Sequence, residues 1–379
     1  MGKQRRNSRQ IDRRRPVASS SLRSRLGMPS VQSLALGAAL LAGLTSSCGD
    51  SLAGGPQPTI PELMQSIQLA PQTTAFQGTR RVKIDHSLEG TPIHLEYTEL
   101  VSSDGAGQFS IQTQDVVDAG RMDPFLFQQM QDARAGFFWR YRDFGVKDWQ
   151  LFTANWQATD LGKSVLVAGR VSWELSVERK TGSNTRYQIA VDLNTGLILR
   201  CLEFHSHGNG VEAQVASFEF ESIDFAPVFT VDHPWHQPSN AEQWIVQGTD
   251  IEQQLGFSPL APKLPPAGYQ LLEVSYVQEP TAEMRRWLKL TYTDGIDSAF
   301  FLFGQPASMT GETSTEGYVG GPSGAGVAPN NSLQDSDEAI YLNAGSVTAV
   351  EAHIGGYDFI GVGKVDVHDL LVMIQSALP

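Results

Sequence analysis

Two groups of histidines have a spacing that a metal site could use. His205 and His207 alternate in the segment HSHGNG, so both would lie on one face of a strand. The segment DHPWH places Asp232 beside His233 and His236. No further ligand cluster in the sequence supports either group, and exposed histidines are common beside turns. We therefore predict that the chain holds no metal ion and no cofactor.

The segment DFIGVGKVDVHD has part of the frame of a calcium-binding loop. Asp358, Gly363 and Asp369 occupy positions 1, 6 and 12 of that frame. Positions 3 and 5 hold Ile360 and Val362, which have no side-chain oxygen to offer a hard cation. We therefore predict that this segment is a strand that runs through Gly363 into a helix.

The sequence lacks the motifs of the common hydrolases and nucleotide-binding enzymes. It has no Gly-x-Ser-x-Gly elbow, no His-Glu-x-x-His pair and no Walker-type phosphate loop. Its carboxylates are scattered, and the serine of GGPSGAG lies in Gly-rich sequence with no strand before it. Cys201, in LILRCLEF, is expected to be a buried and inert thiol. The sequence therefore predicts a protein that is not an enzyme.

The first 47 residues differ from the rest of the chain. They hold Lys3 and eight arginines against Asp12 alone, followed by the short apolar run VQSLALGAALLAGL. This pattern is typical of an export signal, and the apolar run is too short for a membrane span. Two alternatives remain for the position where the leader ends. LTSSCGD offers Cys48 as a lipidated cysteine, and SLA offers an ordinary cleavage site after Ala53. We predict that residues 1–53 direct the chain to the periplasm or the cell envelope, with Cys48 as the lipid anchor in the first alternative.

Removing the leader leaves a strongly acidic chain. The whole sequence has 28 Lys+Arg and 41 Asp+Glu, a formal net charge of −13, and its first 47 residues hold nine of these bases but one of the acids. The remaining residues therefore carry a net charge near −21. Such a charge disfavours nucleic acids and anionic membrane surfaces as partners. With 41% hydrophobic and 18% charged residues, the composition is that of a globular protein.

Residues 57–229 are predicted to form a first domain around one curved antiparallel sheet. An amphipathic helix over 61–70 comes first, and its apolar positions are Leu63, Met64, Ile67 and Leu69. Between the strands, 123–135 is predicted to be a helix capped by Asp123, and the aromatic segments 136–146 and 149–161 are predicted to be paired strands. Alternating segments separated by turns predict the remaining strands, at 79–87, 93–102, 107–117, 164–179, 185–206 and 211–225.

A smaller α+β domain is predicted over 267–379, after a Pro-rich linker at 230–266 that includes a short helix at 249–255. The Gly/Ser/Thr-rich segment 304–336 is predicted to be a disordered loop. A helix over 366–378 should close the chain, with Asp366 as its cap. The predicted fold class is thus α+β and mostly β: a half-barrel sheet with a helix in its concavity, followed by the smaller domain.

A hairpin in the second domain is the clearest local signal. In KLTYTDGIDSAFFLF, residues 289–303, Asp294-Gly295 separates two apolar and β-prone stretches, which predicts a two-residue turn. If Thr293 pairs with Ile296, one face of the hairpin must be buried against another element. That face holds Leu288, Leu290, Tyr292, Ala299, Phe301 and Phe303.

The concave face of the first sheet is a natural place for acyl chains or a partner segment. Its lining is either a ligand surface or an ordinary buried strand face, and the interleaved Arg140 and Arg142 could add cation–π contacts. The candidate ligand-binding residues are Val82, Ile84, Leu95, Tyr97, Phe137, Trp139, Leu151, Phe152, Val177, Ile189 and Val191.

Collinear segments resemble the MucB/RseB family of sigma-factor regulatory proteins. The segment VAGRVSWELSV, with Gly169 and Arg170, and the later RYQIAVDLNTGLILR resemble the core of that family's first domain. FQGTRRVKI resembles its first strand. LPPAGYQLLEV, the YTDG hairpin and GVGKVDVHDLLVMIQSAL occur in the order of its second domain. The resemblance covers most of 57–303 and 345–378 and gives no counterpart to the long loop.

The resemblance implies a LolA/LolB-like half-barrel followed by a C-terminal β domain. It also implies an exported, non-catalytic regulator that binds a membrane-anchored anti-sigma factor, responds to lipid-like ligands and so controls an envelope stress response. Two alternatives remain on the residues alone. One is a periplasmic carrier of lipids or lipoproteins that uses the same concavity, and the other is a structural envelope lipoprotein.

Overall fold

In the computed structural model, the strands after the predicted leader pair into two antiparallel sheets, one of eight strands and one of seven. The predicted leader, with Cys48, and nearly all of the predicted 304–336 loop lie outside the described residues. The structure describes residues 58–88, 91–120, 122–125, 127–128, 143–181, 185–206, 211–235, 242–244, 251–278, 286–304, 339–344, 347–354 and 357–378.

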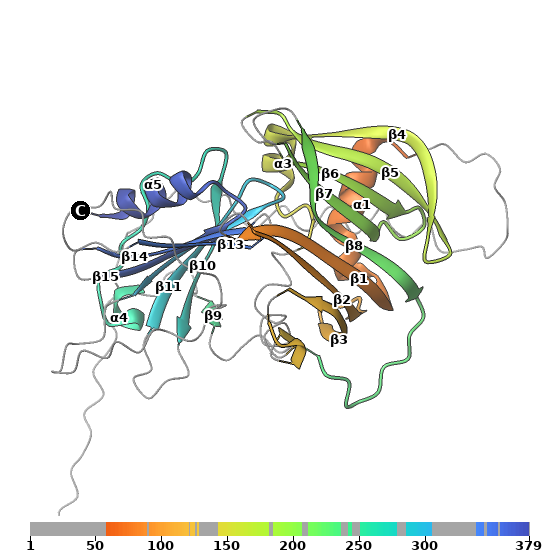
Figure 1. The fold of residues 1–379 in the computed structure, drawn as a ribbon, viewed down its shortest axis with the longest axis horizontal. Helices are drawn as coiled ribbons and strands as arrows, with labels where there is room; N and C mark the ends of the chain where they lie inside the picture. Colours follow the sequence, from red (N-terminus) through yellow and green to blue (C-terminus); the bar gives the residue numbers. More distant parts are fainter. Residues whose placement is uncertain are drawn as a thin grey trace, which may run out of the picture. The chain divides into compact units, whose positions relative to one another are not determined.

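The first sheet has eight strands in the order β3-β2-β1-β8-β7-β6-β5-β4 and curves partly around helix α1 (Figure 1). Shifts of register between several neighbouring strands mark the β-bulges that bend it. Seven of the eight strands match predicted segments, and the eighth, β4, combines the end of the predicted 149–161 strand with the start of the 164–179 segment. The strands are β1 (Ala75–Leu88), β2 (Thr91–Asp104), β3 (Phe109–Ala119), β4 (Trp156–Val167), β5 (Arg170–Arg179), β6 (Thr185–Asp192), β7 (Ile198–Ser206) and β8 (Glu212–Asp224).

Helix α1 (Ile60–Thr73) fills part of the concave face. A capping box starts it: the Thr59 side chain accepts the Glu62 backbone N–H, and the Glu62 carboxylate accepts the Thr59 N–H. Its buried residues are Leu63, Met64, Ile67 and Ala70. The prediction of Leu69 as an apolar contact was wrong, because the α-helical period places Ala70 toward the sheet and leaves Leu69 exposed.

The second sheet has the order β13-β14-β15-β12-β11-β10-β9 and carries helix α5 on one face (Figure 1). Two of its strands were not anticipated: β13, and β9, which lies within the predicted linker and pairs with β10. The predicted short helix and C-terminal helix are confirmed as α4 (Ile251–Leu255) and α5 (Val367–Ala377). The strands are β9 (Glu242–Trp244), β10 (Gln270–Gln278), β11 (Arg286–Thr293), β12 (Ser298–Gly304), β13 (Ala339–Ala344), β14 (Val347–Ile354) and β15 (Tyr357–Gly363).

The hairpin of β11 and β12 buries the predicted face but turns differently. Its six predicted residues all belong to the core between the second sheet and α5. Thr293 pairs with Ser298 rather than Ile296, so the turn has four residues, Asp294 to Asp297. The Asp294 carboxylate accepts the backbone N–H groups of Ile296 and Asp297, which stabilises the longer loop.

The fold class is confirmed, and one element of the first domain was wrong. Residues Trp149–Asn155 form helix α3 instead of a strand, because the Asp148 carboxylate caps its N-terminus by accepting the Leu151 N–H. Only the first helical turn of the predicted 123–135 helix is described, and Asp123 caps it. The remainder of that prediction lies outside the described residues. The division into domains at 229 and 267 stays a prediction. None of the helices among the described residues is both long and apolar enough to cross a membrane.

Candidate functional site

A row of inward-facing side chains crosses the concave face of the first sheet. Strand register places Tyr97 beside Val82, Val82 beside Phe218, and Phe218 beside Cys201. The row continues from Cys201 to Ile189 and then to Leu175. Since neighbours in register point to the same side of a sheet, these residues form one apolar surface.

Helix α1 covers only part of this surface. Leu175, Val177, Ile189 and Val191 share a core cluster with Leu63, Met64 and Ile67 of α1. Val82 and Tyr97 belong to a separate cluster with Phe127, whose ring contacts Tyr97 edge to face with centroids 5.2 Å apart.

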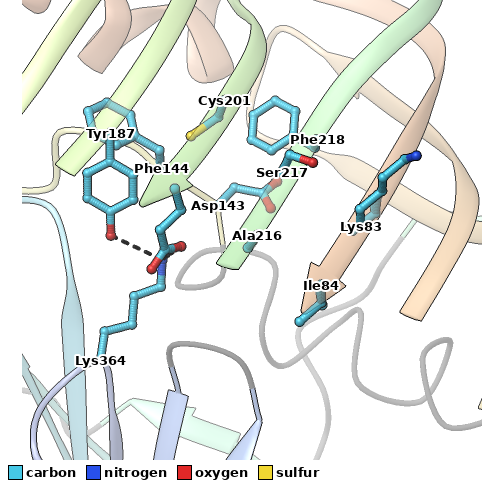
Figure 2. Close-up of a pocket in the computed structure, with 12 residues that line it drawn as sticks. Lys83, Ile84, Asp143, Phe144, Tyr187, Cys201, Ala216, Ser217, Phe218 and Lys364 are labelled. Atoms are coloured by element: carbon cyan, nitrogen blue, oxygen red, sulfur yellow. Dashed lines mark hydrogen bonds and ion pairs between the residues drawn. The ribbon is translucent and has the colours of Figure 1, made fainter. Parts of the chain in front are cut away.

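A pocket lies between these two parts of the face (Figure 2). Its apolar wall consists of Val82 and Ile84 on β1, Phe218 on β8, and Phe144 from the segment before α3. The buried thiol of Cys201 also lines it. The cavity has a volume of about 60 Å³. Because a water molecule occupies about 30 Å³, this space holds roughly two waters and no acyl chain as it stands.

The other end of the pocket is polar and involves both sheets. The Lys364 ammonium, which follows β15, donates to Glu203 Oε2 at 2.7 Å and to the Tyr187 hydroxyl oxygen at 3.1 Å. Tyr187 in turn donates to Asp297 Oδ1 at 2.7 Å. Figure 2 shows Lys364 extending toward the Tyr187 hydroxyl. These four residues join β6 and β7 of the first sheet to the second sheet.

Burial and neighbouring charges shift the pKa values of this cluster. Burial raises the pKa of Asp297 to about 6, although the Lys364 charge opposes the shift. Burial alone would lower the pKa of Lys364, but the carboxylates of Glu203 and Asp297 raise it above its ordinary value. Burial lowers the pKa of the nearby Lys147 to about 8. Burial also raises the pKa of the Cys201 thiol, which agrees with its prediction as inert.

A second buried ion group lies on the same concave face. Arg80 on β1 binds Glu99 on β2, with its Nε 3.0 Å from Oε2, and donates from Nη1 to Asp143 Oδ2 at 2.8 Å. Its guanidinium also lies over the Phe218 ring at 4.8 Å from the centroid. Arg80 therefore fixes the segment that begins at Asp143 onto the sheet.

The predicted ligand-binding residues fall into three places. Val82 and Ile84 line the pocket, and Leu95 and Tyr97 pack beside Val82. Val177, Ile189 and Val191 are buried under α1. Leu151 and Phe152, predicted on a strand, are buried on α3 instead. Phe137 and Trp139, with the interleaved arginines, lie outside the described residues.

Sequence reasoning missed most of the polar end. Tyr187 could have been found, because it alternates with Ile189 and Val191 on the same strand face. Phe218 likewise alternates with Phe220 on β8. Nothing in the local sequence around Lys364, Glu203 or Asp297 indicates that they meet, since they lie on segments far apart in the chain.

Among the described residues, the histidine and calcium motifs form no metal site. Within the part of the chain that the structure describes, no group of three His, Cys, Asp or Glu residues could hold a metal ion. His233 contacts Ser110 Oγ at 3.1 Å, and His205 lies 3.2 Å from Glu203 Oε1, whereas His207 and His236 are not described. Asp358 contacts His353 on the second sheet, and the segment runs as a strand into α5, as predicted.

No protein-family model and no curated protein matches the sequence. The chain is similar to solved structures of MucB. MucB in complex with MucA(peri) is 15% identical, with a TM-score of 0.45, over 85% of this chain and 99% of that one. The MucA/MucB complex of Pseudomonas aeruginosa is 16% identical, with a TM-score of 0.41, over 83% and 96%. MucB alone is 16% identical, with a TM-score of 0.45, over 83% and 96%. These proteins carry the name of the family that the sequence motifs resemble, and at these values the likeness carries no argument about function.

Proposed function

We propose that this chain is an extracytoplasmic, non-catalytic regulator whose two sheets together hold a segment of a membrane-anchored anti-sigma factor. The partner class comes from the sequence resemblance, which spans both domains in order. The export leader supports the compartment. The acidic body, near −21 without the leader, favours a segment with basic residues as the bound element.

One structural observation carries the proposal. The hairpin tip that resembles the family's second domain is buried in the first domain's core: Asp294 and Ile296 are both 0% exposed, and Ile296 joins the cluster under α1. The motif residues of the first domain serve the same assembly. The Asp192 carboxylate binds Arg170 and the Thr195 hydroxyl, and this turn approaches α1. The family-like segments thus build one two-sheet body, which supports a partner that contacts both sheets.

The first experiment is native mass spectrometry of the mature chain, expressed with its own leader and purified gently from its own cell envelope. We expect a stoichiometric single-pass membrane protein that carries a cytoplasmic sigma-binding segment. Recovery of a phospholipid or acylated-protein adduct without any such protein would overturn the regulator proposal.

A lipid carrier is the second candidate, and the apolar wall of the pocket favours it. Val82, Ile84 and Phe218 form an apolar wall, and Lys364 lies at the polar end of the cavity. These side chains suit an acyl chain with a polar head, provided that the cavity of about 60 Å³ widens to admit it. A pair of matched variants tests this role. Ile84→Asp places a charge in the pocket wall, whereas Leu166→Asp places it on a side chain that is 69% exposed. Loss of copurified lipid in the first variant alone supports a ligand in this pocket.

A further inference from the structure

A short segment crosses the concave face beside the pocket. Residues 143–148, here called the strap, run from the Arg80 ion group to the start of α3. Phe144 and Val146 belong to the core under α1, and the Phe144 ring meets Tyr187 edge to face, with centroids 5.0 Å apart. The strap is therefore fixed to the first sheet at its Asp143 end and by the buried side chains of Phe144 and Val146 beyond it.

The other end of the strap is held by the second sheet. The hairpin tip Asp294–Asp297, here called the wedge, accepts the Lys147 backbone N–H on the Gly295 carbonyl at 2.8 Å. The Lys147 ammonium donates to the Ile296 carbonyl. A Cβ at Gly295 would overlap the backbone of Phe152, so only glycine allows this approach. Wedge and strap thus form one packed and hydrogen-bonded contact.

The strap forms one wall of the pocket, which is partly open to solvent. Asp143 and Phe144 line it from the strap, and Lys364 lines it from the second sheet. Its volume of about 60 Å³ admits only waters, so any larger ligand requires a cover to move. The strands of the first sheet are held by continuous ladders. The strap belongs to no strand, and it is held by the burial of Phe144 and Val146 and by its bonds to Arg80 and the wedge. The strap is therefore the part of the enclosure that opens at the lowest free energy.

We propose that the strap is a cover over the concave face and that the wedge of the second sheet holds it shut. Withdrawal of the wedge releases Lys147 and lets the strap leave the pocket. An event at the second sheet thereby controls access to the first. This inference rests on the proposed function for its biological purpose, since it describes how partner binding and ligand access would be coupled.

The charges around the wedge make the contact reversible. Asp297 faces Tyr187 and Glu203 from the first sheet, Lys364 from the second, and Lys147 from the strap. Asp294 lies within the wedge itself, and its Oδ2 is 3.4 Å from the guanidinium of Arg179 on β5. Asp143, at the other end of the strap, faces Lys147. A buried ion cluster of this kind loses much of its attraction to desolvation, so separation into water costs less than separation of an apolar core.

Cys201 reports on the strap without any ligand. Its thiol lines the pocket and is 5% exposed, and a Cys48→Ser background removes the other of the two cysteines. The rate at which the thiol reagent DTNB labels Cys201 in the full chain measures opening of the cover. Lys147→Met removes the charged hydrogen bond between strap and wedge. We expect labelling to accelerate by about two- to tenfold, the range for a typical net hydrogen bond, because burial of the ammonium offsets part of its attraction.

A pair of matched variants tests control from the second sheet. The Thr293 hydroxyl shapes the wedge by donating to the Asp297 carbonyl at 2.8 Å and accepting the Gly295 N–H. Thr293→Val removes these bonds without touching the strap. Thr291→Val removes a hydroxyl two residues earlier on β11, and that hydroxyl makes no hydrogen bond among the described residues. We expect faster labelling for Thr293→Val and a rate close to the parent for Thr291→Val.

The dependence of labelling on urea separates opening of the strap from global unfolding. A local opening exposes little surface, so its rate should rise weakly with urea, whereas labelling through the unfolded state follows the full unfolding slope. Equal labelling rates for the two threonine variants would overturn the inference. So would a labelling rate that rises with urea by the full unfolding slope in every variant. No partner or lipid takes part in this assay, so its failure leaves the proposed function untouched, and an absent partner in native mass spectrometry leaves the strap untouched.

Discussion

The two halves of the concave face share one sheet and one alternation of apolar residues, yet they are stabilised differently. Under α1, Ile189 and Val177 are fully buried among aliphatic and aromatic side chains. On the side of β1 and β8, Val82 and Ile84 face a small cavity that ends in a buried charge cluster. The first half is a packed core, and the second is a small, partly open pocket, part of whose wall comes from another sheet.

This difference shows that an inward-facing strand residue is not by itself a binding residue. What decides its role is whether another element already occupies the space in front of it. Changes in side-chain volume should therefore lower the free energy of unfolding most in the half under α1. Changes in charge should lower it most in the half that holds the pocket.

The largest effect is expected from the charge cluster. Lys364→Met leaves Glu203 and Asp297 buried without their cation, so we expect a loss of about 3–5 kcal/mol in the free energy of unfolding. Arg186→Ala, which breaks the more exposed pair with Glu212, should cost about 0.2–1 kcal/mol. Urea unfolding measures both variants. Similar losses would remove the distinction between a buried junction and a surface ion pair.

The same substitution in each half tests packing. Ile189→Ala should lower the free energy of unfolding by about 2–5 kcal/mol, because the fully buried site under α1 cannot collapse around the missing atoms. Ile84→Ala should cost less than about 2 kcal/mol, because the partly buried Ile84 already borders a cavity. Urea titration of the two variants decides the comparison, and equal losses would mean that the pocket wall is packed as tightly as the core.

The pH dependence of stability should follow Asp297. Its pKa rises from 3.8 to about 6 in the folded chain, so the folded chain binds this proton more tightly than the unfolded chain. The stabilising contribution is fully present below about pH 4 and is lost as the pH rises through 6. Asp297→Asn should remove this loss and gain stability relative to the parent between pH 4 and 7, by at most about 3 kcal/mol.

Urea unfolding of both proteins across this pH range measures the effect. A difference between variant and parent that stays constant from pH 4 to 7 would show that Asp297 does not titrate in the folded chain. Glu62→Gln, at the exposed capping box of α1, serves as a carboxylate control on the same chain.

A second pH-dependent effect, confined to alkaline pH, is expected at Lys147. Its pKa is lowered to about 8 by burial, so the folded chain releases this proton more readily than the unfolded chain. Stability should therefore rise as the pH increases from about 8 toward 10.5, and Lys147→Met should flatten that part of the curve. An unchanged slope in the variant would exclude Lys147 as its source.

The sequence by itself determined the strand faces, the capped helices and the burial of the hairpin face. Alternation along β6 and β8 and the caps at Thr59 and Asp366 are local signals, and they depend on neighbours within a few residues. Leu290 and Phe301 were assigned to one face correctly although the turn was two residues longer than predicted, because a shift of two residues preserves the face.

Only the tertiary structure decided which inward-facing residues form a site. Glu203, Asp297 and Lys364 come from three segments that are more than 60 residues apart, and no local pattern records that they meet. The helix at Trp149–Asn155 also escaped the sequence, since its aromatic residues suit a strand and a cap at Asp148 decides otherwise. For the cluster, the physical reason is that charge pairing and the filling of space depend on distances across the fold, which the order of residues along the chain does not encode directly. The α3 cap at Asp148 is instead a local signal, and the strand-like aromatic residues after it concealed it.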